Sequence, residues 1–106
     1  MNRLTIDELE MLNPDELGKL LRHEVRKISQ DVQFIQDILT VGCSIDARDG
    51  GGWTALHYAA TIGRLEIVKF LVSKGADIHV RINMGKTAWD IASTKIKEAV
   101  PELEPK

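Results

Sequence analysis

The sequence predicts an all-α protein: a short solenoid of helix-turn-helix units that stack side by side and are joined by β-hairpin-like loops. Two observations predict it. Glycines and small residues recur at a single offset of 33 residues, and helix-start and helix-stop signals recur with them. Identical pairs at this offset include Gly42/Gly75, Ile45/Ile78, Arg48/Arg81, Gly52/Gly85, Thr54/Thr87, Ala55/Ala88 and Ala59/Ala92.

The N-terminal part is expected to contain two helices before the repeat pattern becomes regular. Thr5 followed by Glu8 is a capping-box pattern and indicates a short helix over residues 6–12. Asn13 followed by Pro14 is a helix-start pattern and predicts a helix over residues 14–29. The apolar residues of this second helix fall on one face: Leu17, Leu20, Leu21, Val25 and Ile28.

The next helix belongs to the repeat pattern and ends at Gly42. Its apolar residues lie 33 residues before those of a later helix, since Val32, Ile35, Ile38 and Leu39 precede Leu65, Val68, Leu71 and Val72. Equal spacing of the apolar face indicates that the two helices occupy the same place in successive units.

The central unit carries every signal of the repeat. Thr54 is suited to cap a first helix and Gly63 to end it. Residues 65–74 form a second helix, which Gly75 ends in the left-handed conformation. Residues 76–86 alternate apolar with polar side chains and turn at 83–85, which predicts an extended hairpin-like connector.

The C-terminal part repeats the beginning of this unit and then departs from it. Thr87 is expected to begin another helix. Pro101 ends the helical pattern, because proline cannot continue a helix. Residues 102–106 are therefore expected to be a frayed tail.

Three segments carry a resemblance to a known family. Residues 52–60, GWTALHYAA, resemble the helix-start signature of the ankyrin repeat family. Residues 63–68, GRLEIV, and 75–78, GADI, resemble its next two signatures at the right distances. The resemblance covers residues 31–92, and residues 14–30 through their helix pattern alone. It implies a single stack of about three repeats, near the minimum for a stable solenoid.

The resemblance also implies a division of the single domain, 1–106. Residues 1–30 supply the N-terminal cap helices and the first helix of repeat one, and residues 31–48 the rest of that repeat. Residues 49–81 form a full repeat, 82–100 a C-terminal capping repeat and 101–106 a tail. Ile96 stands where the family has a helix-breaking glycine, so one longer helix is expected in the capping repeat. Trp89 replaces a core leucine and is expected to pack between the last two units.

Composition limits the classes of function. The chain has 106 residues, and its 14 basic and 16 acidic side chains give a formal net charge of -2. This balance, with no basic stripe recognised in the sequence, argues against binding to nucleic acid or to anionic lipid. One cysteine, no signal peptide and no apolar segment of membrane-spanning length predict a cytoplasmic protein, although a nuclear or secreted-effector route fits the same features.

Candidate catalytic residues have simpler structural interpretations. Residues 85–87, Gly-Lys-Thr, resemble the end of a phosphate-binding loop, but Val80 stands where that loop needs a glycine. The resemblance implies that His57 is structural and bonds between neighbouring loops. Cys43 is expected to be a small, partly buried residue. The sequence therefore predicts a protein that is not an enzyme and has no cofactor and no metal.

The family resemblance implies a protein-binding surface on the concave side, made by the loop tips and the outer face of the first helices. Carried over by position, this surface comprises Arg48, Asp49, Gly51 and Trp53, then Tyr58, Thr61, Ile62 and Lys74, and finally Arg81, Asn83, Met84 and Lys86. We expect a monomeric adaptor or scaffold whose protein partner is apolar at the centre of the contact and acidic around it. Trp53 is either a binding hot spot or an indole that shields the adjacent loop.

A second hypothesis places the partner protein on another surface of the chain. The chain is then a stoichiometric inhibitor or regulatory subunit that binds an enzyme through its N-terminal cap helices. The acidic side chains there are Asp7, Glu8, Glu10, Asp15 and Glu16. A cap face that simply stays solvated explains the same charges. Alanine substitutions at Trp53 and Arg48 separate the two hypotheses, since only the loop surface needs them.

Overall fold

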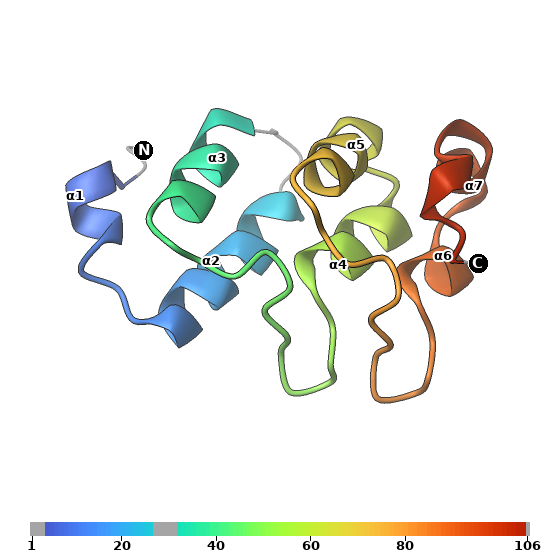
Figure 1. Ribbon diagram of the computed structural model, residues 1–106, viewed down its shortest axis with the longest axis horizontal. Helices are drawn as coiled ribbons and strands as arrows, with labels where there is room; N and C mark the ends of the chain where they lie inside the picture. Colours follow the sequence, from blue (N-terminus) through green and yellow to red (C-terminus); the bar gives the residue numbers. More distant parts are fainter. Residues whose placement is uncertain (1–3, 27–31, 106) are drawn as a thin grey trace.

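The computed structural model describes residues 4–26 and 32–105, which form two rows of helices with long loops on one side (Figure 1). The lower row in Figure 1 comprises α2 (Pro14–Val25), α4 (Ala55–Ile62) and α6 (Ala88–Ile91). The upper row comprises α1 (Ile6–Leu9), α3 (Val32–Thr40), α5 (Leu65–Ser73) and α7 (Thr94–Ala99). A 3-10 helix, η1 (Pro101–Leu103), follows. This arrangement confirms the predicted all-α solenoid.

The helices begin where the capping residues predict. Thr5, Asn13, Thr54 and Thr87 each cap a helix with a side-chain oxygen that accepts from a backbone N–H three residues later. In each case the side chain of that third residue accepts from the N–H of the capping residue in return. Local hydrogen bonding therefore fixes four helix starts, independently of distant parts of the chain.

Helix ends agree less closely with the predictions. Gly63 and Gly75 have φ values of 86° and 91°, which confirms a glycine stop after α4 and a left-handed Gly75 after α5. Helix α1 ends at Leu9 rather than at residue 12, because the chain turns there to place Asn13 in the extended conformation of a cap. The predicted continuation of α2 to residue 29, including Ile28, lies outside the described residues.

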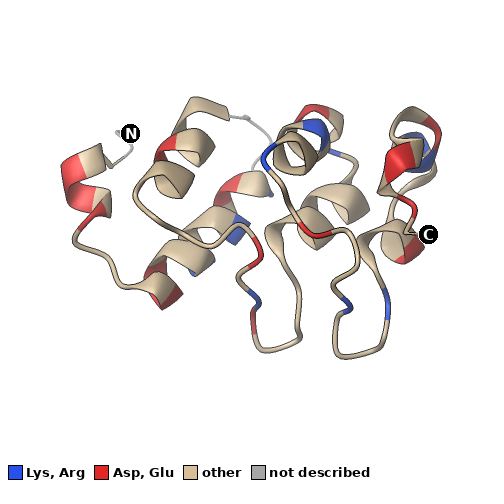
Figure 2. Ribbon diagram, in the orientation of Figure 1, with Lys and Arg blue, Asp and Glu red and all other residues tan. Residues whose placement is uncertain are grey.

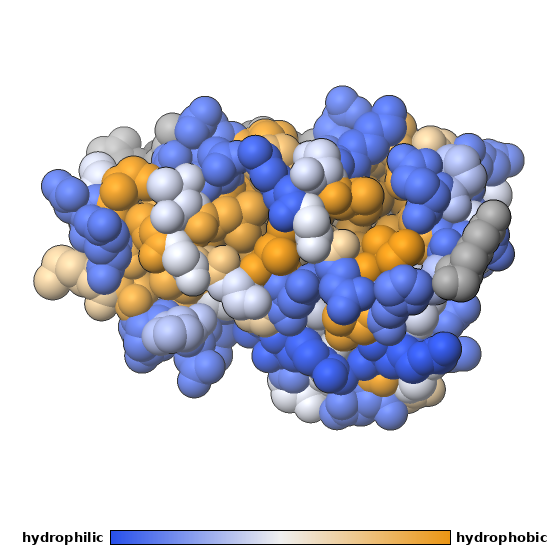
Figure 3. Space-filling view, in the orientation of Figure 1, coloured by the Kyte–Doolittle hydropathy of each residue, from blue (hydrophilic) through white to orange (hydrophobic). Residues whose placement is uncertain are grey.

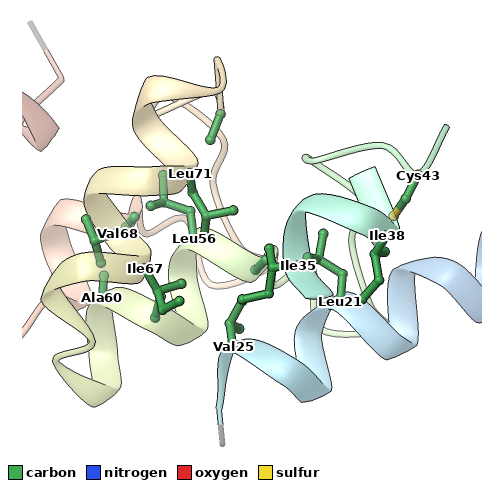
Figure 4. Packing of buried hydrophobic residues seen from close by; sticks show 14 of the residues in the cluster. Leu21, Val25, Ile35, Ile38, Cys43, Leu56, Ala60, Ile67, Val68 and Leu71 are labelled. Atoms are coloured by element: carbon green, nitrogen blue, oxygen red, sulfur yellow. The ribbon is translucent and has the colours of Figure 1, made fainter. Parts of the chain in front are cut away.

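The core lies between the two rows of helices. Aliphatic side chains from α2, α3, α4 and α5 meet there, among them Leu21, Val25, Ile35, Ile38, Leu56, Ala60, Ile67, Val68 and Leu71 (Figure 4). Within their units α2 packs on α3 and α4 packs on α5, and α4 also packs on α2 and α6 of the neighbouring units. Burial of each leucine or isoleucine contributes about 1.5–3 kcal/mol. Contacts between units therefore stabilise the stack as well as contacts within them.

The last unit corrects the expectation of one longer helix. Helices α6 and α7 are separate, because Ala92 adopts an extended conformation with φ −66° and ψ 146°. The N–H of Ser93 donates to the carbonyl of Ala60 at 3.1 Å, and the hydroxyl of Thr61 donates to the carbonyl of Ile91 at 3.3 Å. These bonds to α4 replace the helical bonds at the break. Ile96 then belongs to the core face of α7 and is fully buried.

The expected frayed tail is also wrong for the residues around η1. Leu103 has 0% exposure and belongs to the same core cluster as Val100. The N–H of Leu103 donates to the carbonyl of Val100 at 3.0 Å, which closes the turn that carries it inward. The buried side chain of Leu103 therefore helps to hold η1 against α7.

A helix that crosses a membrane must be both long and apolar. In the part of the chain that the structure describes, no helix has that combination of length and hydropathy.

Candidate protein-binding surface

Two loops extend below the helices in Figure 1 and form the most prominent feature of the candidate surface. We call residues 46–53 finger 1 and residues 79–86 finger 2. In finger 1 the N–H of Asp49 donates to the carbonyl of Trp53 at 3.0 Å, and in finger 2 the N–H of Ile82 donates to that of Lys86 at 2.9 Å. The two fingers are therefore the same hairpin-like turn, repeated 33 residues apart, as the sequence predicts.

Arg48 braces the two fingers against each other. Its Nε donates to the carbonyl of Gly52 at 3.2 Å, within finger 1. Its Nη2 donates to the carbonyl of Arg81 at 2.6 Å, in finger 2. Arg81 is the residue 33 positions later, and it repeats the first of these bonds by donating to the carbonyl of Gly85 at 2.8 Å. The repeat period thus places each arginine against the backbone of its own finger, and Arg48 also bonds to the backbone of the following finger.

Asn83 completes this brace from the other side. Its N–H donates to the carbonyl of Gly51 at 2.9 Å, and its Nδ2 donates to the carbonyl of Gly50 at 3.0 Å. Gly52 leaves the room that these bonds need, because a Cβ there would lie 2.7 Å from Asn83 Oδ1. Arg48 and Asn83 therefore have a structural role, and their contact with a partner stays a prediction.

Asp49 organises the turn of finger 1. Its Oδ1 accepts from the N–H groups of Gly51 and Trp53, each at 2.9 Å, and its Oδ2 accepts from the hydroxyl of Tyr58 on α4. Partial burial alone would raise the pKa of Asp49, but these hydrogen bonds and the nearby Arg22 hold it below its usual range. Burial, reinforced by the Asp49 carboxylate, raises the pKa of Tyr58.

We expect the Tyr58→Phe variant to raise the pKa of Asp49 toward its ordinary value of about 3.9. A folded-state pKa below the unfolded one gives stability that is present above the ordinary value and lost as the pH falls through the folded value. The variant should therefore lose about 1 kcal/mol at neutral pH and show a smaller further loss in acid than the wild type. Carboxyl ¹³C titration by NMR measures the pKa. An unchanged titration of Asp49 in the variant would show that the hydroxyl of Tyr58 does not lower the pKa of Asp49.

Trp53 packs on the beginning of α4, and its predicted role as a binding hot spot stays a prediction. Its indole is half-buried and lies against Tyr58, with ring centroids 5.0 Å apart and an angle of 33° between the rings. Its edge approaches His57, at 6.1 Å between centroids. The ring thus covers the beginning of α4 in its own unit, and its exposed part remains accessible to a partner.

The other predicted contact residues divide into separate groups. Met84 is 80% exposed and, like Lys86 and Gly51, belongs to the fingers. Thr61 and Ile62 are exposed at the far end of α4, beside the break between α6 and α7. Lys74 lines a different hollow, with Cys43 and the end of α3. The structure therefore gathers most of the predicted surface around the fingers and separates Lys74 from it.

A cavity of about 400 Å³ lies between α2 and finger 1 and was not predicted. Its lining comprises Asp15, Lys19, Arg22, Arg26, Arg48, Asp49, Gly50 and Tyr58. Figure 2 shows basic positions along α2 and in both fingers. The signal in the sequence was the spacing of Lys19, Arg22 and Arg26, since residues i, i+3 and i+7 share one face of a helix. A short basic stripe is therefore present along α2 and its C-cap, which corrects the expectation of no basic stripe.

His57 and Cys43 have environments suited to structural roles. Burial lowers the pKa of His57, although the backbone carbonyls of Lys86 and Val80 in finger 2 act in the opposite direction. Its Nδ1 lies 2.7 Å from the hydroxyl of Thr54, while its Nε2 makes no hydrogen bond of normal geometry. Burial raises the pKa of the Cys43 thiol, which opposes formation of the reactive thiolate. Across residues 4–26 and 32–105, no group of acidic, histidine and cysteine side chains is placed to hold a metal ion.

Comparison with known proteins places this architecture in a family. A family model described as Ankyrin repeats (3 copies) matches residues 23–103. The chain is 44% identical to the 2-5A-dependent ribonuclease of Mus musculus over 63 residues, which cover 58% of this chain and 9% of that protein. It is 32% identical to Protein phosphatase 1 regulatory subunit 27 of Homo sapiens over 92 residues, which cover 87% of this chain and 58% of that protein.

A third relative is Protein phosphatase 1 regulatory subunit 12A of Mus musculus, 36% identical over 74 residues that cover 70% of this chain and 7% of that protein. The chain thus spans just over half of one of these relatives and less than a tenth of the other two. Because the family model matches most of the sequence, the chain belongs to the ankyrin repeat family.

Proposed function

We propose that this chain binds a partner protein through the two fingers and the adjoining exposed sides of α2 and α4, as an adaptor or scaffold. The observation that carries the proposal is the brace between the fingers, in which Arg48 and Asn83 bond to the backbone of the opposite finger. A surface held in one conformation loses little conformational entropy on binding. The fingers therefore present their exposed side chains in a preorganised way.

The chemistry of the exposed side chains supports a mixed contact. Figure 3 shows that the fingers are mainly hydrophilic on the face drawn and that the hydrophobic surface lies chiefly over the helices above them. Met84, at the turn of finger 2, is the apolar exception and is exposed. An apolar anchor with polar surroundings is the usual composition of a transient protein interface.

We propose a non-catalytic role. A nucleophilic cysteine needs a lowered pKa and a histidine that can act as its base. Cys43 has a raised pKa, and His57 is buried with its Nδ1 committed to Thr54. Neither side chain suits catalysis, whereas both suit the support of α3, α4 and finger 2.

The test compares two methionines that match in type and exposure. Met84 is 80% exposed on finger 2, and Met11 is 85% exposed after α1 in the N-terminal cap. We expect Met84→Glu to weaken capture of the partner from an extract of the source cells by about tenfold or more, because a charge in a desolvated contact costs over 1.4 kcal/mol. Met11→Glu should leave capture within about twofold of the wild type. Circular dichroism checks that both variants fold.

The reverse pattern, with loss only in Met11→Glu, would reject the finger surface in favour of the N-terminal cap. The substitutions Trp53→Ala and Arg48→Ala are less selective than Met84→Glu. Arg48 holds the fingers together and Trp53 covers the start of α4, so their removal disturbs the surface itself.

A second candidate function is regulation of an enzyme through the N-terminal cap. Two of the relatives are named as regulatory subunits of protein phosphatase 1, which favours an enzyme as the partner. Some of the acidic side chains in this cap already hold helix starts through hydrogen bonds. Glu8 and Glu16 each accept from the backbone N–H of a capping residue, so Asp7, Glu10 and Asp15 are the exposed carboxylates left to contact a partner. Loss of capture in Met11→Glu would support this candidate.

A further inference from the structure

We infer that the cavity between α2 and finger 1 binds the carboxylate of an aspartate or glutamate side chain from an acidic segment of the partner protein. This inference rests on the proposed function, because the partner delivers the carboxylate. It assigns a specific chemistry to one part of the surface, at the side of finger 1 that faces α2.

The charge of the cavity is opposite to the charge of the chain. Four cationic side chains and two carboxylates line it, which sum to a formal charge of +2, whereas the whole chain carries -2. The cations come from two segments, since Lys19 and Arg22 lie on α2, Arg26 is the C-cap residue of α2, and Arg48 belongs to finger 1. The fold therefore concentrates positive charge at a place where the overall composition predicts none.

Arg22 is the most constrained of these cations. It is only 7% exposed, and its Nη1 donates to the carbonyl of Ala47 at 3.1 Å. Gly18, one turn earlier, leaves the space that it fills, because a Cβ at Gly18 would lie 3.1 Å from both Arg22 Nη1 and Ala47 Cβ. A nearly buried guanidinium is weakly screened by water, so it attracts an incoming anion more strongly than an exposed lysine does.

The other two arginines are held in place as well. The Nε of Arg26 donates to the carbonyl of Arg22 at 3.2 Å, and its Cζ lies 4.7 Å from the centre of the Tyr58 ring. Arg48 is fixed by its bonds to the carbonyls of Gly52 and Arg81. Guanidinium groups that are already ordered bind an anion without a further loss of side-chain entropy.

These contacts hold the cations without neutralising them. All of the hydrogen bonds just described have neutral backbone carbonyls as acceptors. The carboxylate of Asp49 is occupied by Tyr58 and by two backbone N–H groups. The hydrogen bonds of the three guanidinium groups therefore leave their charge largely available to a ligand, apart from the attraction between Arg22 and the nearby Asp49 carboxylate.

The chemistry and the size of the cavity favour a carboxylate over other anions. A guanidinium matches a carboxylate with two parallel hydrogen bonds, which suits a group with a single charge. A phosphate carries nearly two charges, so the four cations attract it more strongly and Asp15 and Asp49 repel it more strongly. A carboxylate is favoured because aspartate and glutamate are the ordinary anionic side chains of a protein partner. Nucleic acid requires a basic surface along several phosphates, and this cavity of about 400 Å³ provides one localised site.

The experiment uses a blocked octapeptide of glutamate as the probe and the blocked octapeptide of glutamine as its neutral counterpart. NMR titration follows the Nε–H signals of the arginine side chains in the full chain. We expect the glutamate peptide to shift the signals of Arg22, Arg26 and Arg48 in a saturable, salt-sensitive way, and the glutamine peptide to leave them unchanged. Inorganic phosphate, titrated separately, should bind more weakly than the glutamate peptide.

Charge-removing variants make the result specific to the cavity. Arg26→Gln should weaken binding of the glutamate peptide by roughly fivefold or more, and Lys19→Gln by about twofold to threefold, because an ammonium cannot bind a carboxylate with two parallel hydrogen bonds. Lys95→Gln removes the same charge from α7, away from the cavity, and should leave binding within about 1.5-fold of the wild type. Circular dichroism confirms that the variants are folded.

The outcomes separate this inference from the proposed function. Equal weakening in Lys95→Gln, unshifted Arg22 and Arg48 signals, or tighter binding of phosphate than of the glutamate peptide would overturn the carboxylate site. Loss of the cellular partner in Met84→Glu would still support the finger surface in each of those cases. Specific peptide binding together with no effect of Met84→Glu would instead keep the carboxylate site and reject the finger surface.

Discussion

Replacement of Gly52 by alanine is expected to destabilise the protein by about 2–4 kcal/mol. The Cβ of alanine would lie 2.6 Å from Arg48 Nη2 and 2.9 Å from the backbone nitrogen of Asn83. Both atoms belong to the brace between the fingers, so neither can move without breaking hydrogen bonds to the backbone. Gly52 also has a φ of 83°, a conformation that costs an alanine about 1–2 kcal/mol.

Urea unfolding followed by circular dichroism measures this loss, and Gly50→Ala is its matched control. Gly50 lies two residues earlier in the same finger, and a Cβ there meets no atom within 4 Å. Its replacement should change the free energy of unfolding by less than about 0.5 kcal/mol. If the two alanine variants proved equally stable, the fingers could not be in the close contact described.

The second large effect is expected at Leu103, in the segment that the sequence predicts to be frayed. Leu103→Ala should cost about 2–4 kcal/mol, because the leucine is completely buried beside Val100 and its removal leaves a cavity in the core. The loss should appear in the single unfolding transition of the whole stack, since neighbouring units stabilise one another.

Glu102→Ala controls for the effect of substitution in η1. Glu102 is exposed in the same turn as Leu103, so its replacement should change stability by less than about 0.5 kcal/mol. A Leu103→Ala variant as stable as Glu102→Ala would mean that the C-terminal segment is not docked on the core.

The parts of the fold that local chemistry determines could be predicted from the sequence. Thr54 and Thr87 cap their helices through residues three positions away, and Gly75 adopts its left-handed conformation because it lacks a Cβ. The break between α6 and α7 could not be predicted in this way. It depends on a hydrogen bond from Ser93 to Ala60, which exists only once the last two units have stacked.

In the candidate surface, too, some features could be predicted from local sequence and others depend on the packing of distant segments. The repeat period located both fingers, but it gave no indication that Arg48 and Asn83 bond to the backbone of the opposite finger. The cavity was missed because its cations come from two distant segments. The stripe of Lys19, Arg22 and Arg26 was recognisable from its helical spacing alone, whereas its proximity to Arg48 required the position of finger 1 against α2.

Hydrogen exchange of the captured complex, measured by mass spectrometry with and without the partner, tests the central claim most directly. The proposed surface predicts slower exchange in finger 1 and finger 2 when the partner is bound, with no change over residues 5–12. Slower exchange confined to α1 and the first turn of α2, with both fingers unaffected, would contradict the claim and would place the partner on the N-terminal cap.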